Sequence, residues 1–190
     1  TDYDVHRNWL AVTHSRDASE WYADAPLQNQ WTLDYPPLFA MYEAILSKIA
    51  ARVDGKIVEE SERDYASVSC VRFQRFTVVL TELASLGVAV RAATAGDAKS
   101  ALAFAGSGAL LLVDHVHFQY NGLLLGVLVY ALFMLRRGDH VKAGMLFALL
   151  CCAKHLFFLQ TTPRSLMGNF FLLAFNPDMA VIRVKDLDGR

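Results

Sequence analysis

The sequence has little charge and little cysteine for its size. Charged residues make up 19% of its 190 residues and hydrophobic residues 54%, whereas a typical soluble domain has about 25% charged and about 45 to 50% apolar residues. The shortage of charge is greatest after Lys99, where apolar blocks alternate with short polar segments. This distribution is typical of a membrane protein, although the length alone would suit a soluble domain.

Three further absences narrow the class of protein. The cysteines, Cys70, Cys151 and Cys152, are too few and too poorly spaced for a disulfide framework, so we expect packing residues. The net charge is only −1 and no basic patch with interleaved aromatics is present, which argues against nucleic-acid binding. No initiator methionine or signal peptide precedes Thr1, so we expect a piece of a longer protein whose first membrane span lies upstream.

Residues 1–72 hold most of the polar sequence and predict a membrane-surface region. Their first half is rich in amphipathic aromatics, which suit a membrane interface: Trp9, Trp21, Tyr22, Trp31 and Tyr35. Pro36 and Pro37 then begin a helix over residues 38–53, in which apolar residues recur at helical spacing and charged residues such as Glu43 lie elsewhere. We expect this helix to lie in the interface rather than to span the membrane.

Residues 73–176 predict transmembrane helices joined by short loops. Five apolar segments fall in this range: Phe73–Val90, Ala101–Val113, Gly122–Leu135, Ala143–Leu159 and Leu166–Phe175. Several reach the about 20 residues of a span only with flanking polar residues, as happens where helix ends line a protein cavity. Residues 177–190 form a polar tail. The predicted fold class is therefore all-α, a polytopic transmembrane helix bundle preceded by interfacial helices.

The charges of the loops predict how the chain is oriented in the membrane. The basic residues of the apolar half lie in two loops, 91–99 and 136–142, and positive loops stay on the cytoplasmic side. Alternation of the spans then places residues 1–53, 114–121 and 160–165 on the opposite face. Every unusual polar motif of the chain shares that face.

Two acidic residues near the start of the chain are candidates for chemistry. Asp2 and His6 fall at helical spacing and so share one face of a helix. Asp2 could act as a general base, or it could cap the helix, whose first turn favours an acid. Asp34 precedes the turn Tyr35-Pro36-Pro37, where an acid most often accepts a local hydrogen bond.

The densest polar run of the apolar half lies between two predicted spans. Asp114, His115 and His117 could ligate a metal. No further His or Cys at ligand spacing accompanies them, so binding of a sugar or phosphate by the histidines with Gln119 and Asn121 is at least as natural. We expect no metal here.

A charged pair lies near the end of a predicted span. Lys154 and His155 fall where charge is costly and usually functional. A lysine at that depth suits a phosphate anion, and it could equally extend its charge to the interface. Glu82, inside another predicted span, is expected to pair within the bundle.

Four stretches carry a resemblance to a known family. TDYDVHRNWLAVTHS, WTLDYPPLFAMYE, RFQRFTVVL and LLVDHVHFQYNG closely resemble the dolichyl-phosphate-glucose-dependent α-1,3-glucosyltransferases of N-glycosylation. That family has two branches, which add the first and the second glucose to the lipid-linked oligosaccharide. The run His-Arg-Asn-Trp-Leu-Ala is similar to the second-glucose branch, because the first-glucose branch usually has Gln-Arg-His-Trp there. The resemblance extends from Thr1 to about His155 and is poor from Thr161 to Arg190.

The resemblance implies a multi-pass enzyme of the endoplasmic reticulum membrane, in contact with its lipids, with a GT-C fold and a lumenal active site. Such an enzyme transfers glucose from dolichyl-phosphate-glucose to Glc1Man9GlcNAc2-PP-dolichol with inversion, forms an α-1,3 linkage, and needs no metal or other cofactor. The family's catalytic acid aligns with Asp2, although Thr1 stands where glycine is often found. This alignment favours Asp2 as the general base.

The resemblance also implies a set of substrate-binding residues on the same face as Asp2. We expect them to be His6, Arg7, Asp34, His115, His117, Gln119, Asn121, Lys154 and His155. The candidates for the phosphate of the leaving group are Arg7, Lys154 and His155.

Three other interpretations compete with this one. The chain could belong to the first-glucose branch, which acts on Man9GlcNAc2-PP-dolichol. It could be a segment of a transporter, but the paired, broken spans of that class are absent from the sequence. The short apolar runs would also fit a soluble, all-helical interaction domain, which solubility without detergent would reveal.

Overall fold

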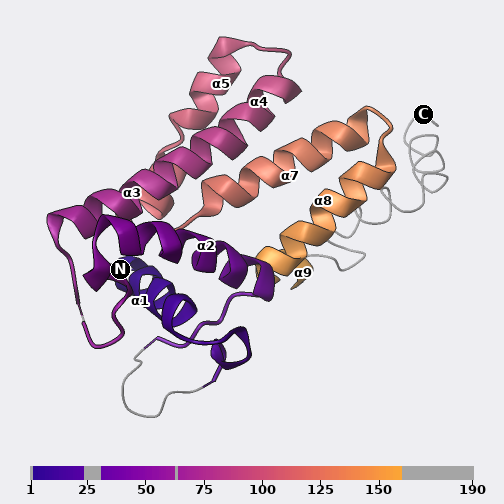
Figure 1. Ribbon diagram of the computed structural model, residues 1–190. Coiled ribbons are helices and arrows are strands. Elements are labelled where there is room, and N and C mark those ends of the chain that lie inside the picture. The colour runs from indigo at the N-terminus through magenta and orange to yellow at the C-terminus, as the bar shows by residue number, and fades with distance from the viewer. Residues whose placement is uncertain (1, 24–30, 63, 160–190) are drawn as a thin grey trace, which may run out of the picture.

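The computed structural model describes residues 2–23, 31–62 and 64–159 (Figure 1). Within these ranges the chain consists of helices, turns and loops without a strand, which confirms the all-α class. The helical elements are α1 (Asp2–Ser15), η1 (Ala18–Glu20), α2 (Pro37–Val53), η2 (Gly55–Val58), α3 (Val68–Glu82), η3 (Leu83–Gly87), α4 (Val88–Ala93), α5 (Ala98–Ala105), α6 (Gly108–Leu110), η4 (Leu111–Val116), α7 (Asn121–Arg136), α8 (His140–Ala153) and α9 (His155–Leu159).

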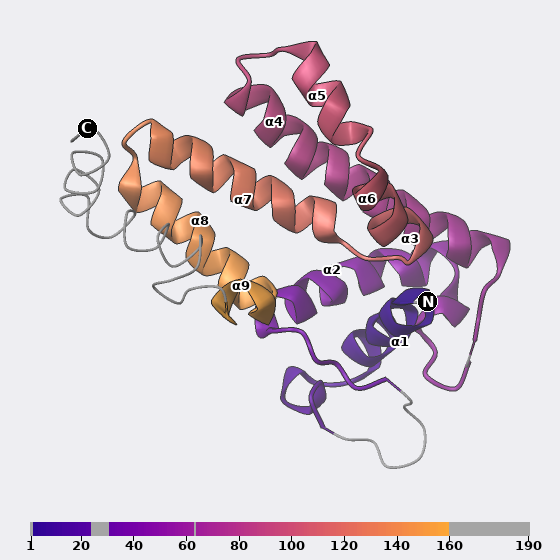
Figure 2. The same cartoon turned by 180° about the vertical axis from the view of Figure 1, so that it is seen from behind.

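The helices form two groups, seen from opposite sides in Figures 1 and 2. α1 and α2 lie against each other at one end of the structure. The long helix α3–η3–α4 and the antiparallel pair α7 and α8 extend away from them. The turns that follow α4 and α7 lie far from α1, whereas the backbone N–H of Asp2 in α1 donates to the His117 carbonyl at 3.1 Å. The basic turns and the polar motifs therefore lie at opposite ends.

Local sequence sets where the helices begin. Pro37 is the first residue of α2, as the Pro-Pro pair predicts, because proline fits the first helical position. Ser67 caps α3 by accepting a 3.1 Å hydrogen bond from the backbone N–H three residues later. Asp139 caps α8 in the same way at 3.2 Å. The first residues of α2, α3 and α8 are thus set by their local sequence.

The predicted membrane spans are present in part. Among the described residues, one helix is long and apolar enough to cross a membrane, the 26-residue helix Val68–Ala93. α7 and α8 are apolar but shorter, because α7 ends at a basic turn and α8 at Lys154. The segment predicted over 101–113 is broken between α5 and α6. The one predicted over 166–175 lies outside the described residues.

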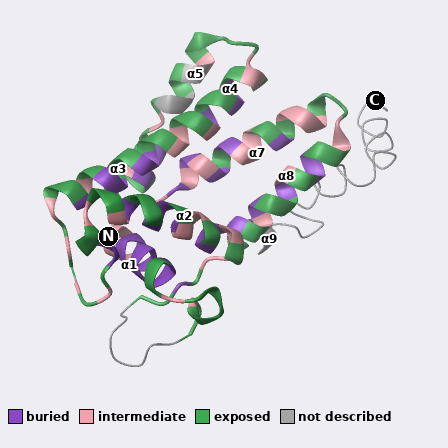
Figure 3. Cartoon of the chain, in the orientation of Figure 1, coloured by how far each residue is buried: buried purple, intermediate pink, exposed green. Residues whose placement is uncertain are grey.

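α2 has the predicted apolar stripe, but this stripe faces outward (Figure 3). Four of its side chains are 46 to 62% exposed: Met41, Ile45, Ile49 and Val53. The opposite face of the helix is the buried one, and it carries Glu43, which is fully buried. The sequence pattern locates the stripe correctly and misses the acid that α2 places in the core.

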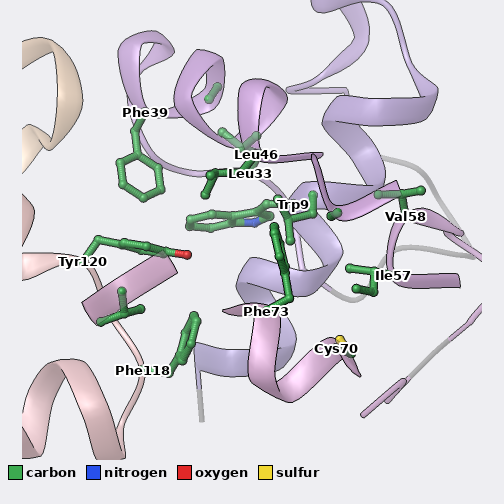
Figure 4. Packing of buried hydrophobic residues seen from close by; sticks show 14 residues of the cluster. Trp9, Leu33, Phe39, Leu46, Ile57, Val58, Cys70, Phe73, Phe118 and Tyr120 are labelled. Atoms are coloured by element: carbon green, nitrogen blue, oxygen red, sulfur yellow. The ribbon is translucent and has the colours of Figure 1, made fainter. Parts of the chain in front are cut away.

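The main core lies where α1, α2, η2 and the start of α3 meet (Figure 4). Trp9 from α1 packs there with Phe39 from α2 and with Phe118 and Tyr120 from the loop before α7. The four rings bury large apolar surfaces, each of which contributes about 1.5 to 3 kcal/mol to folding. This core therefore joins the loop before α7 to the first helix, although more than a hundred residues separate them.

Two glycines let α7 approach the long helix. A Cβ at Gly126 would collide with Ser85 Oγ and with the backbone N of Leu86, and a Cβ at Gly122 would lie 2.6 Å from Glu82 Cγ. The contact falls at η3, a π turn that widens the long helix locally. Only glycine allows this close approach.

We expect Gly126→Val to destabilise the whole protein by about 1 to 3 kcal/mol, because the added side chain must push α7 off the long helix. Thermal unfolding in detergent would measure this loss. Gly87→Val is the matched control, because nothing lies within 4 Å of a Cβ built at Gly87. An equal loss in both variants would show that the close contact at Gly126 does not matter.

Candidate active site

Asp2, the first residue of α1, is bound to the loop before α7. Gln119 donates from Nε2 to Asp2 Oδ2 at 2.6 Å, and His117 Nε2 lies 3.3 Å from the same oxygen. Among the described residues the carboxylate makes no hydrogen bond to the backbone of its own helix. This geometry argues against the capping role and leaves one carboxylate edge for another partner.

The loop reaches Asp2 through a strained backbone. Phe118, between the two residues that contact Asp2, adopts a positive φ of 77°. Such a conformation costs a bulky residue about 1 to 3 kcal/mol and persists only where the surroundings hold it. The Phe118 ring is 2% exposed and packs edge-on against Tyr3 and Tyr120. Burial of this ring therefore stabilises the turn that directs Gln119 to Asp2.

Asn121 connects Gln119 to the lysine that follows α8. Its Nδ2 donates to Gln119 Oε1 at 2.8 Å, and its Oδ1 accepts from Lys154 Nζ at 2.9 Å. Lys154 Nζ also lies 5.2 Å from the ring centroid of Tyr35, a cation–π distance. A continuous series of hydrogen bonds thus runs from the carboxylate of Asp2 through two amides to an ammonium group.

Asp114 holds Asn121, the second amide of this series, in place. It is 1% exposed and accepts hydrogen bonds from Asn121 Nδ2 and from the backbone N–H groups of Asn121 and Gly122. A carboxylate at the start of α7 satisfies its free N–H groups and its positive end. Asp114 therefore holds Asn121 in place and is not free for a metal or a sugar.

We expect Asp114→Asn to destabilise the whole protein by about 1 to 3 kcal/mol, because the amide nitrogen would face buried donors. The midpoint of thermal unfolding in detergent would measure this change. Asp139→Asn is the control, because Asp139 caps α8 with a side chain that is 33% exposed, and we expect a much smaller effect. Equal effects at the two caps would contradict the buried role of Asp114.

A cavity of about 300 Å³ opens beside Asp2. Its lining includes His6, Asp34 and Tyr35 together with the indole rings of Trp9 and Trp31, while Val5 and Thr32 complete the wall. Burial raises the pKa of Tyr35 to about 12, so its hydroxyl remains protonated near neutral pH. Acids, a histidine and indole surfaces around such a volume can bind a sugar by hydrogen bonds and stacking.

The structure brings together most of the predicted site residues but not all. Asp34 lines the cavity and its carboxylate has no hydrogen-bond partner among the described residues, so the predicted local hydrogen bond is absent. Arg7 lies elsewhere: it is 3% exposed and donates to the carbonyls of Ile57 at 3.4 Å and Glu59 at 3.0 Å. Its guanidinium therefore fixes α1 to η2 and does not reach the cavity.

The predicted site histidines His115, His117 and His155 also have different surroundings. His115 turns away from Asp2 and pairs with Glu82 at 2.8 Å, which is the partner within the bundle expected for that acid. His155 packs edge-on against Tyr35, with 6.5 Å between ring centroids. Of the two alternating histidines only His117 contacts Asp2. In the part of the chain that the structure describes, no group of three or more His, Cys, Asp or Glu side chains could hold a metal ion.

Sequence reasoning missed one polar residue of this region. Glu43 is fully buried and lies 2.6 Å from His6 Nδ1. Its position in α2, one turn after Phe39, was the available signal, because a charged residue at the spacing of buried residues usually has a partner.

Comparison with known proteins gives a consistent result. Residues 1–178 match the ALG6, ALG8 glycosyltransferase family. The chain is 46% identical to the dolichyl pyrophosphate Glc1Man9GlcNAc2 alpha-1,3-glucosyltransferase of Arabidopsis thaliana, over 83% of this chain and 32% of that protein. It is 43% identical to the protein of the same name from Eremothecium gossypii, over 97% and 33%, and 37% identical to that from Mus musculus, over 95% and 37%.

These matches show the family of the chain and the share of its relatives' length that it covers. The similarity continues to residue 178 and, in the Eremothecium protein, covers 97% of the chain, so it reaches beyond Thr161, from which the resemblance was expected to be poor. The chain spans about a third of the length of the curated relatives that it matches, from 32 to 37%. The chain belongs to the ALG6, ALG8 glycosyltransferase family.

Proposed function

We propose that the protein to which this chain belongs transfers glucose from dolichyl-phosphate-glucose to Glc1Man9GlcNAc2-PP-dolichol, forming an α-1,3 linkage with inversion. The relatives that cover most of this chain are named for that acceptor, which favours the second-glucose reaction over the first. The chain would contribute the part of the enzyme that holds the base and one side of the sugar site.

One observation carries the proposal: a carboxylate and an ammonium group stand at the two ends of one hydrogen-bonded series, next to a cavity. Asp2 is joined through Gln119 and Asn121 to Lys154, and Asp2 lines the cavity. Transfer from a lipid phosphate with inversion needs a base at the attacking hydroxyl and a positive partner for the departing phosphate. The two ends of the series would supply these groups.

In this mechanism Asp2 takes the proton from a hydroxyl of the terminal glucose of the acceptor. The hydroxyl oxygen attacks the anomeric carbon of the donor in line, and the bond from that carbon to the phosphate oxygen breaks. Dolichyl phosphate leaves with the electron pair, and Lys154, with His155 nearby, stabilises its charge. No metal takes part, because the protein's own cation meets the phosphate.

The remaining polar groups would bind the sugars. Gln119 and Asn121 hold Asp2 and Lys154 in register, and His117 extends the polar surface beside Asp2. Asp34 lies across the cavity with its carboxylate available to sugar hydroxyls. Arg7 and His115 would not contact the sugars directly, because Arg7 donates to the Glu59 carbonyl and His115 pairs with Glu82.

The same arrangement supports a multi-pass enzyme with its site on the lumenal face of the endoplasmic reticulum membrane. The 26-residue helix and the apolar helices α7 and α8 would cross or enter the bilayer. The exposed apolar stripe of α2 would rest in the interface, as in other amphipathic surface helices. The basic turns at the far end would then face the cytoplasm.

The choice of sugar donor provides a test of this proposal. The whole protein in detergent would be supplied with the monoglucosylated acceptor and either dolichyl-phosphate-glucose or UDP-glucose, each with and without EDTA. We expect transfer only from the lipid-linked donor, at a rate that EDTA does not change. Transfer from UDP-glucose, or a loss of transfer in EDTA, would contradict the proposal.

A further inference from the structure

A buried pair of a histidine and a carboxyl group, His6 and Glu43, lies beside the cavity and takes no part in the mechanism above. His6 Nδ1 is 2.6 Å from Glu43 Oε1, with the His6 and Glu43 residues 2% and 0% exposed. The other carboxyl oxygen, Glu43 Oε2, is buried and has no hydrogen-bond partner among the described residues. Burial raises the pKa of Glu43, which the contact with His6 opposes.

Aromatic rings fix the His6 ring in one place. Five ring centroids lie within 4.8 to 6.3 Å of it, those of Trp9, Tyr35, Phe39, Phe118 and Tyr120. Such a surrounding excludes water and leaves little room for the ring to turn. The orientation set by Glu43 is therefore the one that the imidazole keeps.

The second ring nitrogen of His6 is not engaged by Glu43. Nε2 of His6 has no hydrogen-bond partner among the described residues, yet it is not one of the fully buried atoms without a partner. His6 lines the same cavity as Asp2 and Asp34. Nε2 is therefore the ring nitrogen that remains for a molecule bound in the cavity.

The net charge of the His6–Glu43 pair determines whether Nε2 carries a hydrogen. A lone carboxylate with a neutral histidine would bury an uncompensated charge, which is costly. A pair with no net charge holds one more proton, either as carboxylate with imidazolium or as carboxylic acid with imidazole. In the first arrangement both ring nitrogens carry hydrogens, and in the second Nδ1 accepts the hydrogen of the carboxylic acid at Oε1, so Nε2 carries a hydrogen in both. The pair presents an N–H donor to the cavity wherever the shared proton lies.

We propose that His6, oriented by the positioning residue Glu43, donates a hydrogen bond from Nε2 to a hydroxyl oxygen of the acceptor glucose in the cavity. This inference rests on the proposed function. The bound oxygen is not the attacking one, because a hydrogen bond donated to a nucleophile withdraws the electron density that it needs. It belongs to a neighbouring hydroxyl, so His6 orients the sugar while Asp2 takes the proton.

Two substitutions of His6 separate this role from a structural one. His6→Gln places an amide nitrogen near the position of Nε2, whereas His6→Asn places one near Nδ1, where it meets only Glu43. Steady-state transfer by the whole protein would be measured with varied acceptor. We expect His6→Asn to raise the KM for acceptor about 10-fold with kcat little changed, and His6→Gln to stay within about threefold of wild type, as the loss of a binding contact requires.

The controls keep the outcomes distinct. Glu43→Leu removes the partner of Nδ1 and lets the ring leave this orientation, so we expect it to raise the KM for acceptor. Glu43→Gln, whose amide can donate to Nδ1 and so keep the hydrogen on Nε2, should restore part of that loss. Size-exclusion chromatography would confirm equal amounts of folded protein. Equal KM values in the two His6 variants, or a larger loss in His6→Gln, would overturn the inference. An inactive wild-type protein would instead count against the proposed function.

Discussion

Asp2→Asn should reduce the kcat of glucosyl transfer by about 10²- to 10⁴-fold, which is the usual contribution of a general base. The asparagine oxygen can still accept the hydrogen bond that Gln119 gives to Asp2 at 2.6 Å, so α1 and the loop before α7 should stay joined. The amide cannot accept a proton from a sugar hydroxyl. Initial rates of the whole protein with both substrates saturating would measure the effect on the chemical step.

A second acid in the same cavity provides the matched control. Asp34 lines the cavity with Asp2 but has no hydrogen-bond partner among the described residues. We expect Asp34→Asn to act on acceptor binding, with a loss of less than about tenfold in kcat/KM. A larger loss of kcat in Asp34→Asn than in Asp2→Asn would show that Asp34 is the base.

The second large effect is expected at Lys154, where Lys154→Met should lower kcat/KM for the donor by about 10²-fold. Methionine keeps most of the length of the side chain and removes the charge that would meet the departing phosphate. Lys154 Nζ donates to Asn121 Oδ1 and lies over the Tyr35 ring, and among the described residues it contacts no carboxylate directly. Its charge is therefore available to an anion.

A lysine at the opposite end of the structure controls for loss of charge alone. Lys142 is 69% exposed and pairs with Asp139 in the turn between α7 and α8. Lys142→Met should leave kcat/KM within about twofold of wild type, since an exposed pair contributes little. Should Lys154→Met behave like Lys142→Met, the phosphate must be held by residues other than Lys154.

Much of the fold could be predicted because local signals set it. Pro36 and Pro37 locate the start of α2, and the apolar runs locate the long helix, α7 and α8. The interfacial helix expected over residues 38–53 has its apolar stripe outward, but the pattern does not show that the opposite face is buried in a protein core. The position of Glu43 in the core depends on His6, which lies 37 residues away in the chain.

The arrangement of the site, like that of the fold, could be predicted only in part. Loop charges and alternation placed Asp2 and the polar run before α7 on one face, and the structure joins them through a hydrogen bond between residues 117 positions apart. The separate roles of neighbours could not be read from the sequence. Asp114 caps α7, His115 pairs with Glu82, and only His117 contacts Asp2. Those differences depend on which way each side chain leaves a strained loop.

The identity of the acceptor tests the proposed reaction most directly. The whole protein would be incubated with labelled dolichyl-phosphate-glucose and either Man9GlcNAc2-PP-dolichol or Glc1Man9GlcNAc2-PP-dolichol, with Asp2→Asn as the blank, and the released oligosaccharides would be sized. We expect one added hexose on the monoglucosylated acceptor only, and none with the variant. Growth of the unglucosylated acceptor alone would assign the protein to the first-glucose reaction, and equal product from Asp2→Asn would remove Asp2 from the mechanism.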